Sequence, residues 1–241
     1  MIISGTTLYG GGYYDAPPGY STNGLMVNLL TAPSSGTTWT DIQGGYNATL
    51  QGSTSYVSNN GGGIRLNNST YGGTDYISLP YNISSNTFTI EMVASFNPTS
   101  YWATVWANET YTGSVGFYAY MTSTTSITWG KAGGQTSSTI TASNSIRHWI
   151  WMINNTSASL YLNGSQVGTT ATVATQSSFL SGDFYFGARH QNNGGGPGID
   201  KMNNSTAANY PVFYQMRIYN RALSTTEVTQ NYNAVKGTYG I

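Results

Sequence analysis

The carboxylates and histidines are the side chains of this sequence that could do acid–base chemistry. Hydrolysis of a glycosidic bond needs two carboxyl groups facing it, about 5–9 Å apart. The chain has eight carboxylates, and they are scattered singly: Asp15, Asp41, Asp75, Glu91, Glu109, Asp183, Asp200 and Glu227. Neither His148 nor His190 lies near a G-x-S-x-G elbow or a cysteine, so we expect both at the surface or rim. These residues predict a protein that is not an enzyme.

Two segments carry residue types that suit a neutral, hydroxyl-rich ligand. Residues 98–113 (PTSYWATVWANETYTG) are dense in aromatic side chains, and residues 190–210 (HQNNGGGPGIDKMNNSTAANY) form a long connection rich in glycine and amides. Aromatic faces stack on sugar rings while amides bond the hydroxyls. We therefore predict a glycan contact made by Trp102, Trp106, Asn108, Tyr111, His190, Asn192 and Asn193. The alternative is that Trp102 and Trp106, which share one face, fill the core.

Charge is unusually scarce in this chain of 241 residues. Charged residues make up 7% of it, where about 25% is typical of globular domains, and eight basic residues balance eight acidic ones. Such a surface does not attract nucleic acid or anionic lipid, so we expect no nucleic-acid partner. The chain turns polar soon after Met1, and we expect neither a signal peptide nor membrane insertion. A low content of charged residues suits a protein that packs beside partners or contacts neutral ligands. The alternative is that the composition has drifted toward Ser, Thr, Asn and Gly without a functional reason.

The sequence alternates as β-structure over most of its length. In Thr87–Phe96 the apolar residues fall on one face, which predicts a half-buried strand whose second face meets solvent or a ligand. Asn163-Gly164 favours a type I′ hairpin turn. Similar short runs recur at 115–121, 126–129, 147–154, 159–162, 166–170, 183–188 and 212–220. They predict an all-β fold, a two-sheet antiparallel jelly-roll sandwich.

One short helix is signalled near the end of the chain. Ser224, followed three residues later by Glu227, is a capping box, in which the hydroxyl and the carboxylate each accept a backbone N–H. This pattern predicts a helix over Thr225–Asn233, directly after a strand that closes at Asn220. We expect the apolar residues around the cap to be buried, namely Tyr219, Leu223 and Val228.

The chain is expected to form one domain with an arm. Residues 1–24 are too rich in Gly and Pro for a strand interior, and we interpret them as an irregular N-terminal arm. Residues 25–241 show no fixed-period repeat and no linker between the strands, which favours a single domain. The arm has little means of folding alone but offers backbone and aromatic surface to a partner protein.

Six motifs follow one another along the chain: SSGTTWTDIQGGYNATLQG (34–52), GTDYISLP (73–80), NTFTIEMVASF (86–96), ASLYLNGSQVG (158–168), FYFGAR (184–189) and MRIYNRALSTTEVTQNYNAVKG (216–237). In their order and approximate spacing they resemble laminin G-like domains of the concanavalin A-like superfamily. The resemblance covers about 25–237. It implies a concanavalin A-like jelly roll whose last strand is followed by a short helix packed on its edge.

The resemblance also bears on metal and enzyme chemistry. Laminin G-like domains often hold calcium at the sandwich rim, and the matching loop here offers Asp41 and Asn47 as ligands. Relatives commonly carry acidic residues where this chain has Tyr214 and Gln215, which weakens the predicted calcium site. Hydrolytic relatives carry a Glu-x-Asp-x-Glu strand, and this chain has none.

The Asn-, Tyr- and Gly-rich composition is similar to that of laminin G-like proteins of tailed bacteriophages. This similarity implies a non-enzymatic virion surface protein, such as a capsid decoration, head fibre or tail fibre component. We expect many copies, attached to other virion proteins through the arm and binding neutral host-surface glycans weakly. The alternative is a free cell-surface or secreted lectin module, and a glycan-active hydrolase is the third reading.

Overall fold

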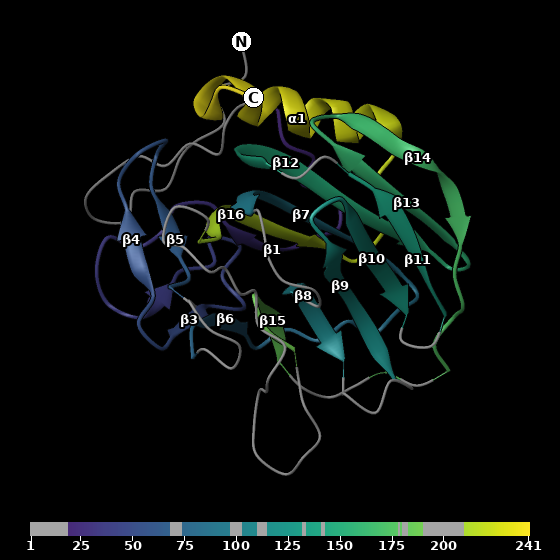
Figure 1. Ribbon diagram of the computed structural model, residues 1–241, viewed down its shortest axis with the longest axis horizontal. Helices are drawn as coiled ribbons and strands as arrows, with labels where there is room; N and C mark the ends of the chain where they lie inside the picture. The colour runs from purple at the N-terminus through teal and green to yellow at the C-terminus, as the bar shows by residue number, and fades with distance from the viewer. Residues whose placement is uncertain are drawn as a thin grey trace.

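Two stacked β-sheets and one helix form the described part of the molecule. The computed structural model describes residues 19–67, 74–96, 103–109, 115–131, 134–140, 143–177, 179, 183–189 and 210–241. Each sheet has eight strands, neighbouring strands pair antiparallel, and a helix lies across the outside of the first sheet (Figure 1). This architecture confirms the predicted all-β sandwich with a C-terminal helix. Within the described ranges, no helix is both long and apolar enough to span a membrane.

The strand order places the two longest first-sheet strands next to each other in the middle of that sheet. The first sheet runs β14 (Ser165–Thr172), β13 (Ser157–Leu162), β12 (Ser143–Asn154), β7 (Thr87–Phe96), β16 (Val212–Tyr219), β5 (Gly63–Arg65) and β4 (Ser55–Val57), and β1 (Leu25–Leu29) also pairs with β16. The second sheet runs β11 (Gly134–Thr139), β10 (Ser126–Lys131), β9 (Gly116–Ser123), β8 (Ala103–Glu109), β15 (Phe184–Phe186), β6 (Tyr76–Leu79), β3 (Ala48–Gln51) and β2 (Thr38–Trp39).

The core between the sheets is strongly aromatic. Trp106 of β8 stacks on Phe184 of β15 with ring centroids 5.6 Å apart, and it meets Trp151 of β12 edge-on at 6.0 Å. Phe88 of β7 approaches the same ring edge-on at 6.4 Å. All four rings are buried. Because each such ring removes about 150–250 Å² from water, this cluster is a major source of stability in a chain without cysteine.

Strand β7 is buried on both faces, so the prediction that its second face meets solvent or a ligand is wrong. Ile90 and Met92 face the aromatic core, as the alternation predicted. Thr89 and Glu91 on the opposite face are also fully buried. The reason is tertiary, because helix α1 (Thr225–Tyr239) covers the outside of the first sheet (Figure 1).

Helix α1 begins as the sequence predicts and ends later. Both hydrogen bonds of the Ser224–Glu227 capping box are present. The helix continues past the predicted end at Asn233 to Tyr239, and Gly240 caps it with a left-handed φ of 65°. Its last turns are held by tertiary packing, since Val235 and Tyr239 are buried against the first sheet. The predicted burial of the residues around the cap is confirmed for Tyr219, Leu223 and Val228.

The predicted hairpin at Asn163-Gly164 is confirmed. Both residues have positive φ, 49° and 76°, and the turn closes on the pair Leu162–Ser165 between β13 and β14. Gly164 also lies under the helix, because a Cβ placed there would come within 2.7 Å of the Tyr232 ring. The turn is therefore packed against α1 as well as closing the hairpin.

We predict that Gly164→Ala destabilises the domain more than Gly168→Ala. Both glycines have positive φ, which costs a side chain about 1–2 kcal/mol, but a Cβ at Gly168 meets nothing within 4 Å. Overpacking against Tyr232 should add about 1–3 kcal/mol at Gly164 alone. Urea unfolding of the two variants measures the difference, and equal losses of stability would contradict the packing of the turn under α1.

Candidate functional site

A surface groove beside the edge strand β4 has the properties of a site for a neutral ligand. It has a volume of about 600 Å³ and is lined by Thr31, Ala32, Pro33, Ser34, Ser35, Thr40, Ile42 and Tyr56. A second hollow shares Pro33, Ser34, Ser35 and Tyr56 and extends to Gly36, Leu50, Thr54, Ser55 and Ile64. We call the two together the β4 groove. None of the described residues that line it is charged.

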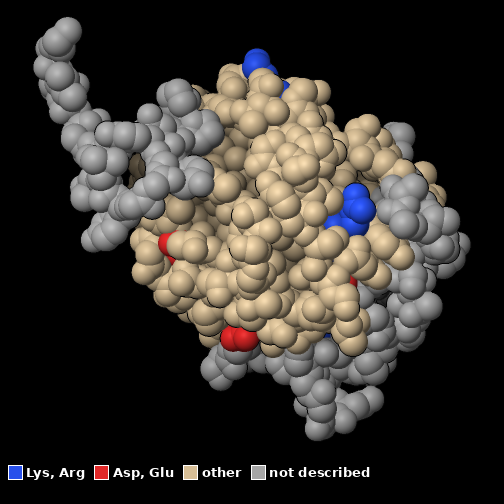
Figure 2. Space-filling model, turned by 90° about the vertical axis from the view of Figure 1, so that its left-hand side faces the viewer, with Lys and Arg blue, Asp and Glu red and all other residues tan. Residues whose placement is uncertain are grey.

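The β4 groove is lined by both apolar and hydroxyl side chains. Tyr56 is 40% exposed and Ile42 is 47% exposed, although large apolar side chains of this chain are mostly buried. Figure 2 shows the side of the molecule that carries β4 and β5, and nearly all of its described surface belongs to uncharged residues. An exposed ring beside hydroxyl groups can stack on the face of a sugar, while the protein hydroxyls form hydrogen bonds with the hydroxyl groups of the sugar.

Asp41 fixes the wall of the groove that carries Ile42. Its two carboxylate oxygens accept four backbone N–H groups at 2.8–3.2 Å, from Asn28, Gln43, Gly45 and Tyr46. Its own N–H donates to Asn47 Oδ1 at 2.9 Å. Because the carboxylate is buried and ties the loop to β1, it holds the wall in one conformation.

The same bonds occupy the lone pairs that the Asp41 carboxylate would offer to a calcium ion. Calcium takes six to eight oxygen ligands, whereas each Asp41 oxygen already accepts two backbone N–H groups. Asn47 Oδ1 accepts the Asp41 N–H. The described residues contain no cluster of three or more His, Cys, Asp or Glu side chains. Gln215 Oε1 accepts hydrogen bonds from Tyr20 Oη and from Arg217.

The predicted glycan-binding residues do not form a described surface site. Trp106 is fully buried in the core and Asn108 is 2% exposed, with Nδ2 donating to the Asp183 carbonyl at 3.4 Å. Neither side chain can touch a surface ligand, so these two predictions are corrected, and the core alternative is confirmed for Trp106. The other predicted contacts lie outside the described residues: Trp102, Tyr111, His190, Asn192 and Asn193.

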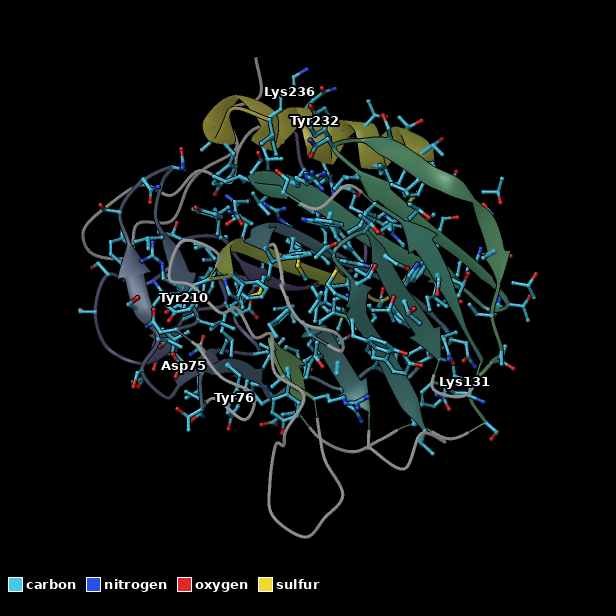
Figure 3. The ribbon with its side chains drawn as sticks, in the orientation of Figure 1. Asp75, Tyr76, Lys131, Tyr210, Tyr232 and Lys236 are labelled. Carbon is cyan, nitrogen blue, oxygen red and sulfur yellow. The ribbon has the colours of Figure 1, made fainter. Side chains whose placement is uncertain are left out.

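A buried polar cluster lies between the first sheet and α1. Glu91 is its centre, and four groups donate to its carboxylate: Arg217 at 2.7 Å, His148 at 2.8 Å, Asn231 at 2.7 Å and Tyr219 at 3.1 Å. His148 is 1% exposed, so the prediction of a surface or rim histidine is wrong for it. Its ring stacks on Tyr232 of α1, labelled in Figure 3, with centroids 6.0 Å apart.

The ion pair determines the charge state of this cluster. Burial alone raises the pKa of Glu91, but the Arg217 guanidinium and the hydrogen bonds from His148 and Asn231 lower that pKa to about 2. Burial raises the pKa of Tyr20 to about 12, so its hydroxyl stays protonated and donates to Gln215 at 2.8 Å. The cluster is closed to solvent, and its carboxylate cannot reach a substrate.

The N-terminal segment contributes side chains to this cluster. The folded domain therefore begins before residue 25, where the sequence placed the end of the arm. The Arg217 guanidinium lies 3.4 Å from the Tyr20 ring centroid, and the Ser21 N–H donates to Asn231 Oδ1 at 2.9 Å. Arg221 Nε donates to the Asn23 carbonyl at 2.8 Å. Residues 20–23 are therefore part of the folded domain, while residues 1–18 of the predicted arm lie outside the described residues.

Two further carboxylates bind parts of the fold together. Asp75, labelled in Figure 3, is buried and accepts the Ser53 N–H at 2.7 Å and the Asn67 N–H at 2.9 Å. Glu227 caps α1 and pairs with Arg221. Like Asp41 and Glu91, these groups are engaged in holding structure. The residues of the β4 groove were missed by sequence reasoning, and the available signal was Tyr56, an aromatic residue isolated in a Ser-, Thr- and Gly-rich run.

The chain belongs to the concanavalin A-like lectin/glucanases superfamily, because the model of that family matches residues 71–229. This match confirms the family that the motifs indicated. No curated protein matches the chain in sequence.

Solved structures show the same fold at low sequence identity. Trypanosoma rangeli sialidase in complex with sialic acid is 16% identical, with a TM-score of 0.62 over 89% of this chain and 33% of that chain. The receptor binding domain of botulinum neurotoxin type G is 16% identical, with a TM-score of 0.63 over 88% of this chain and 51% of that chain. A structure of botulinum neurotoxin type C is 12% identical, with a TM-score of 0.64 over 88% and 51%. This chain thus spans about a third of the sialidase and half of the toxin chains.

The expectation that the protein is not an enzyme is contradicted by these neighbours. Sialidase chains contain this fold, so the fold gives no reason to set hydrolases aside. The scattered carboxylates were insufficient evidence, because residues far apart in sequence converge in space. The side chains of Asp15, Glu109 and Asp200 lie outside the described residues.

We predict that Glu91→Gln lowers the free energy of unfolding at neutral pH by about 3–5 kcal/mol, because it leaves Arg217 buried without a counter-charge. The folded-state pKa of Glu91 is about 2, below its ordinary 4.5. Its contribution to stability is therefore present above pH 4.5 and lost as pH falls through about 2. Urea unfolding at several pH values should show the gap between wild type and variant narrowing over that window.

Glu227→Gln is the matched control for this experiment. Its pair with Arg221 is partly exposed, with side chains 21% and 25% accessible, and exposed pairs contribute about 0–1 kcal/mol. Glu227→Gln should therefore lower the free energy of unfolding at neutral pH much less than Glu91→Gln does. If the difference in free energy of unfolding between wild type and Glu91→Gln stayed constant from neutral pH to pH 2, the assignment of Glu91 as the buried anion would be contradicted.

Proposed function

We propose that this domain binds neutral glycans through the β4 groove. The observation that carries the proposal is the groove itself, where exposed Tyr56 and Ile42 adjoin serine and threonine hydroxyls and the described lining carries no charge. A neutral hydroxylated ligand satisfies both kinds of surface, whereas an anionic ligand finds no cation among these described residues. The lectin-like fold supports the proposal.

We propose that a single groove binds its ligand weakly and that many copies of the domain together bind with useful affinity. An open groove of this kind suits a dissociation constant near 1 mM, which corresponds to about 4 kcal/mol. Display of many domains on one particle raises the overall affinity without any new contact. We propose the surface of a virion as that setting, as a capsid decoration, head fibre or tail fibre component, with a free cell-surface or secreted lectin as the alternative.

We predict that Tyr56→Ala weakens glycan binding by multivalent protein about tenfold, a loss of about 1.4 kcal/mol. Tyr56→Phe keeps the ring and is the matched control, so it should bind nearly as wild type. Biotinylated domains on streptavidin, applied to arrays of neutral glycans, provide the measurement. Thermal unfolding should be nearly unchanged, since Tyr56 is 40% exposed. Equal binding by the Ala variant, or no binding by wild type, would contradict the proposal.

The proposed attachment to other virion proteins has a separate test. Deletion of residues 2–18 spares Tyr20 and Ser21, which are part of the buried cluster. The truncated protein should keep its melting temperature and be missing from purified particles, as measured by mass spectrometry. Presence of the truncated protein at wild-type levels would assign attachment to another part of the chain, and absence of the full chain from particles would favour the free lectin.

A further inference from the structure

The β4 groove consists of two hollows that share one wall. The larger hollow has a volume of about 600 Å³ and the smaller one about 230 Å³. Four residues line both hollows and therefore form the boundary between them: Pro33, Ser34, Ser35 and Tyr56. Pockets of about 300–1,000 Å³ hold drug-sized ligands, and a single sugar ring is smaller than such a ligand. The groove therefore has room for more than one sugar unit.

Tyr56 is held in place on this boundary. A Cβ placed at Gly62 would come within 2.6 Å of the Tyr56 hydroxyl oxygen and 2.9 Å of its ring carbon Cε2, so the ring lies against the backbone there. The Gly62 N–H donates to the Asn59 carbonyl at 3.1 Å, which closes the turn that supports the ring. The Tyr56 side chain nevertheless stays 40% exposed. None of the other described residues that line the two hollows is aromatic, so both hollows share this one ring.

The smaller hollow combines an apolar floor with a hydroxyl rim. Leu50 of β3 and Ile64 of β5 line it, and both side chains belong to the core between the two sheets. Thr54 and Ser55 add hydroxyl groups beside the serines of the shared wall. A sugar ring has C–H faces and carries its hydroxyl groups around its edge, so it matches a floor and a rim of this kind.

The larger hollow offers the same chemistry beyond the shared wall. Thr31 and Thr40 supply hydroxyl groups, and Ile42 supplies an exposed apolar surface. The Ile42 N–H donates to the Asn28 carbonyl at 3.0 Å, which ties this part of the lining to β1. The described lining of both hollows is uncharged, so each one suits a neutral sugar unit.

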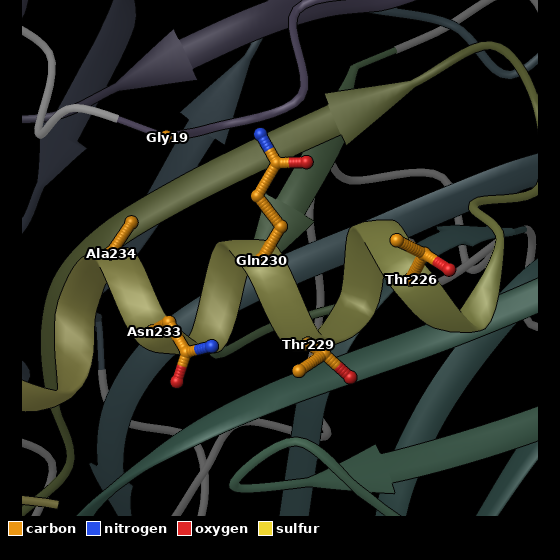
Figure 4. Close-up of a pocket in the computed structure, with 6 residues that line it drawn as sticks. All are labelled: Gly19, Thr226, Thr229, Gln230, Asn233 and Ala234. Atoms are coloured by element: carbon orange, nitrogen blue, oxygen red, sulfur yellow. The ribbon is translucent and has the colours of Figure 1, made fainter.

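Two other surface hollows lack an aromatic ring that a sugar could reach. The groove between β11 and β14 has Trp129 in its lining, but that side chain is 1% exposed. The hollow on the outer face of α1 has no aromatic residue among those that line it (Figure 4): Gly19, Thr226, Thr229, Gln230, Asn233 and Ala234. The β4 groove is therefore better suited to a glycan than either of these two hollows.

We propose that the β4 groove binds neutral oligosaccharides of at least two linked sugar units, one in each hollow, with Tyr56 between them. This inference rests on the proposed function, because it specifies the length of the glycan bound at the same groove. A monosaccharide occupies one hollow and forgoes the contacts of the other. When two units are linked, the second contact becomes intramolecular, so an oligosaccharide binds more tightly than its own monosaccharide.

The length of the bound glycan can be measured with the multivalent wild-type protein. Arrays that carry glucose, galactose, mannose and N-acetylglucosamine, each as mono-, di- and trisaccharides, show which sugars bind. The same saccharides in free form then compete for binding to the array. For the sugar that binds, the free di- or trisaccharide should inhibit at a concentration about tenfold or more below that of the monosaccharide.

Variants of each hollow test whether both are occupied. Thr54 lines the smaller hollow alone and Thr40 the larger hollow alone, and a change of either residue to Val removes a hydroxyl group while it keeps the side-chain shape. Thr54→Val and Thr40→Val should each weaken oligosaccharide binding about two- to tenfold, the effect of one lost hydrogen bond. Thr49→Val is the matched control, because Thr49 is exposed on β3 and lines neither hollow. Thermal unfolding shows whether each variant is folded.

The outcomes distinguish this inference from the proposed function. If wild type bound none of these glycans at any length, the proposed function would fail together with the inference. If monosaccharides inhibited as well as their di- and trisaccharides, the groove would be a site for one sugar unit, and the inference alone would be overturned. Weaker binding in one of the two hollow variants but not the other, or in Thr49→Val, would also overturn it.

Discussion

The buried ion pair between Glu91 and Arg217 is the interaction on which the rest of the structure depends. Two charges removed from water are costly unless every remaining donor and acceptor is satisfied, and here His148, Asn231 and Tyr219 complete the coordination of the carboxylate. Asn231 comes from α1, so the helix must lie where it does. Tyr20 covers the guanidinium, so the chain that enters the domain must lie there too.

The neutral surface follows from the way this chain uses its few charges. Asp41 and Asp75 fold loops by accepting backbone N–H groups, Glu227 caps the helix, and Glu91 is buried. These carboxylates are engaged in hydrogen bonds within the fold, and most of the described surface on the side of β4 belongs to uncharged residues (Figure 2). Recognition on such a surface relies on ring stacking and hydroxyl hydrogen bonds, which suit neutral ligands and give little affinity per site.

The fold of this chain occurs in proteins with different functions. The same sandwich occurs in a sialidase and in neurotoxin binding domains at 12–16% identity, so membership of the superfamily leaves both catalysis and binding open. The four described carboxylates discussed above hold loops, the helix cap or the buried cluster. Function must therefore be argued from particular surfaces, of which the β4 groove is the one used here.

The sequence by itself determined the features that depend on neighbouring residues. Alternation in Thr87–Phe96, the Asn163-Gly164 turn and the Ser224–Glu227 cap act over a few residues, and all three are present. Only the tertiary structure decided which faces are covered. Helix α1 buries Glu91 and His148, the facing sheet buries Trp106, and loops distant in sequence leave Tyr56 exposed. Burial depends on contacts between residues far apart in the chain, and local patterns carry no record of such contacts.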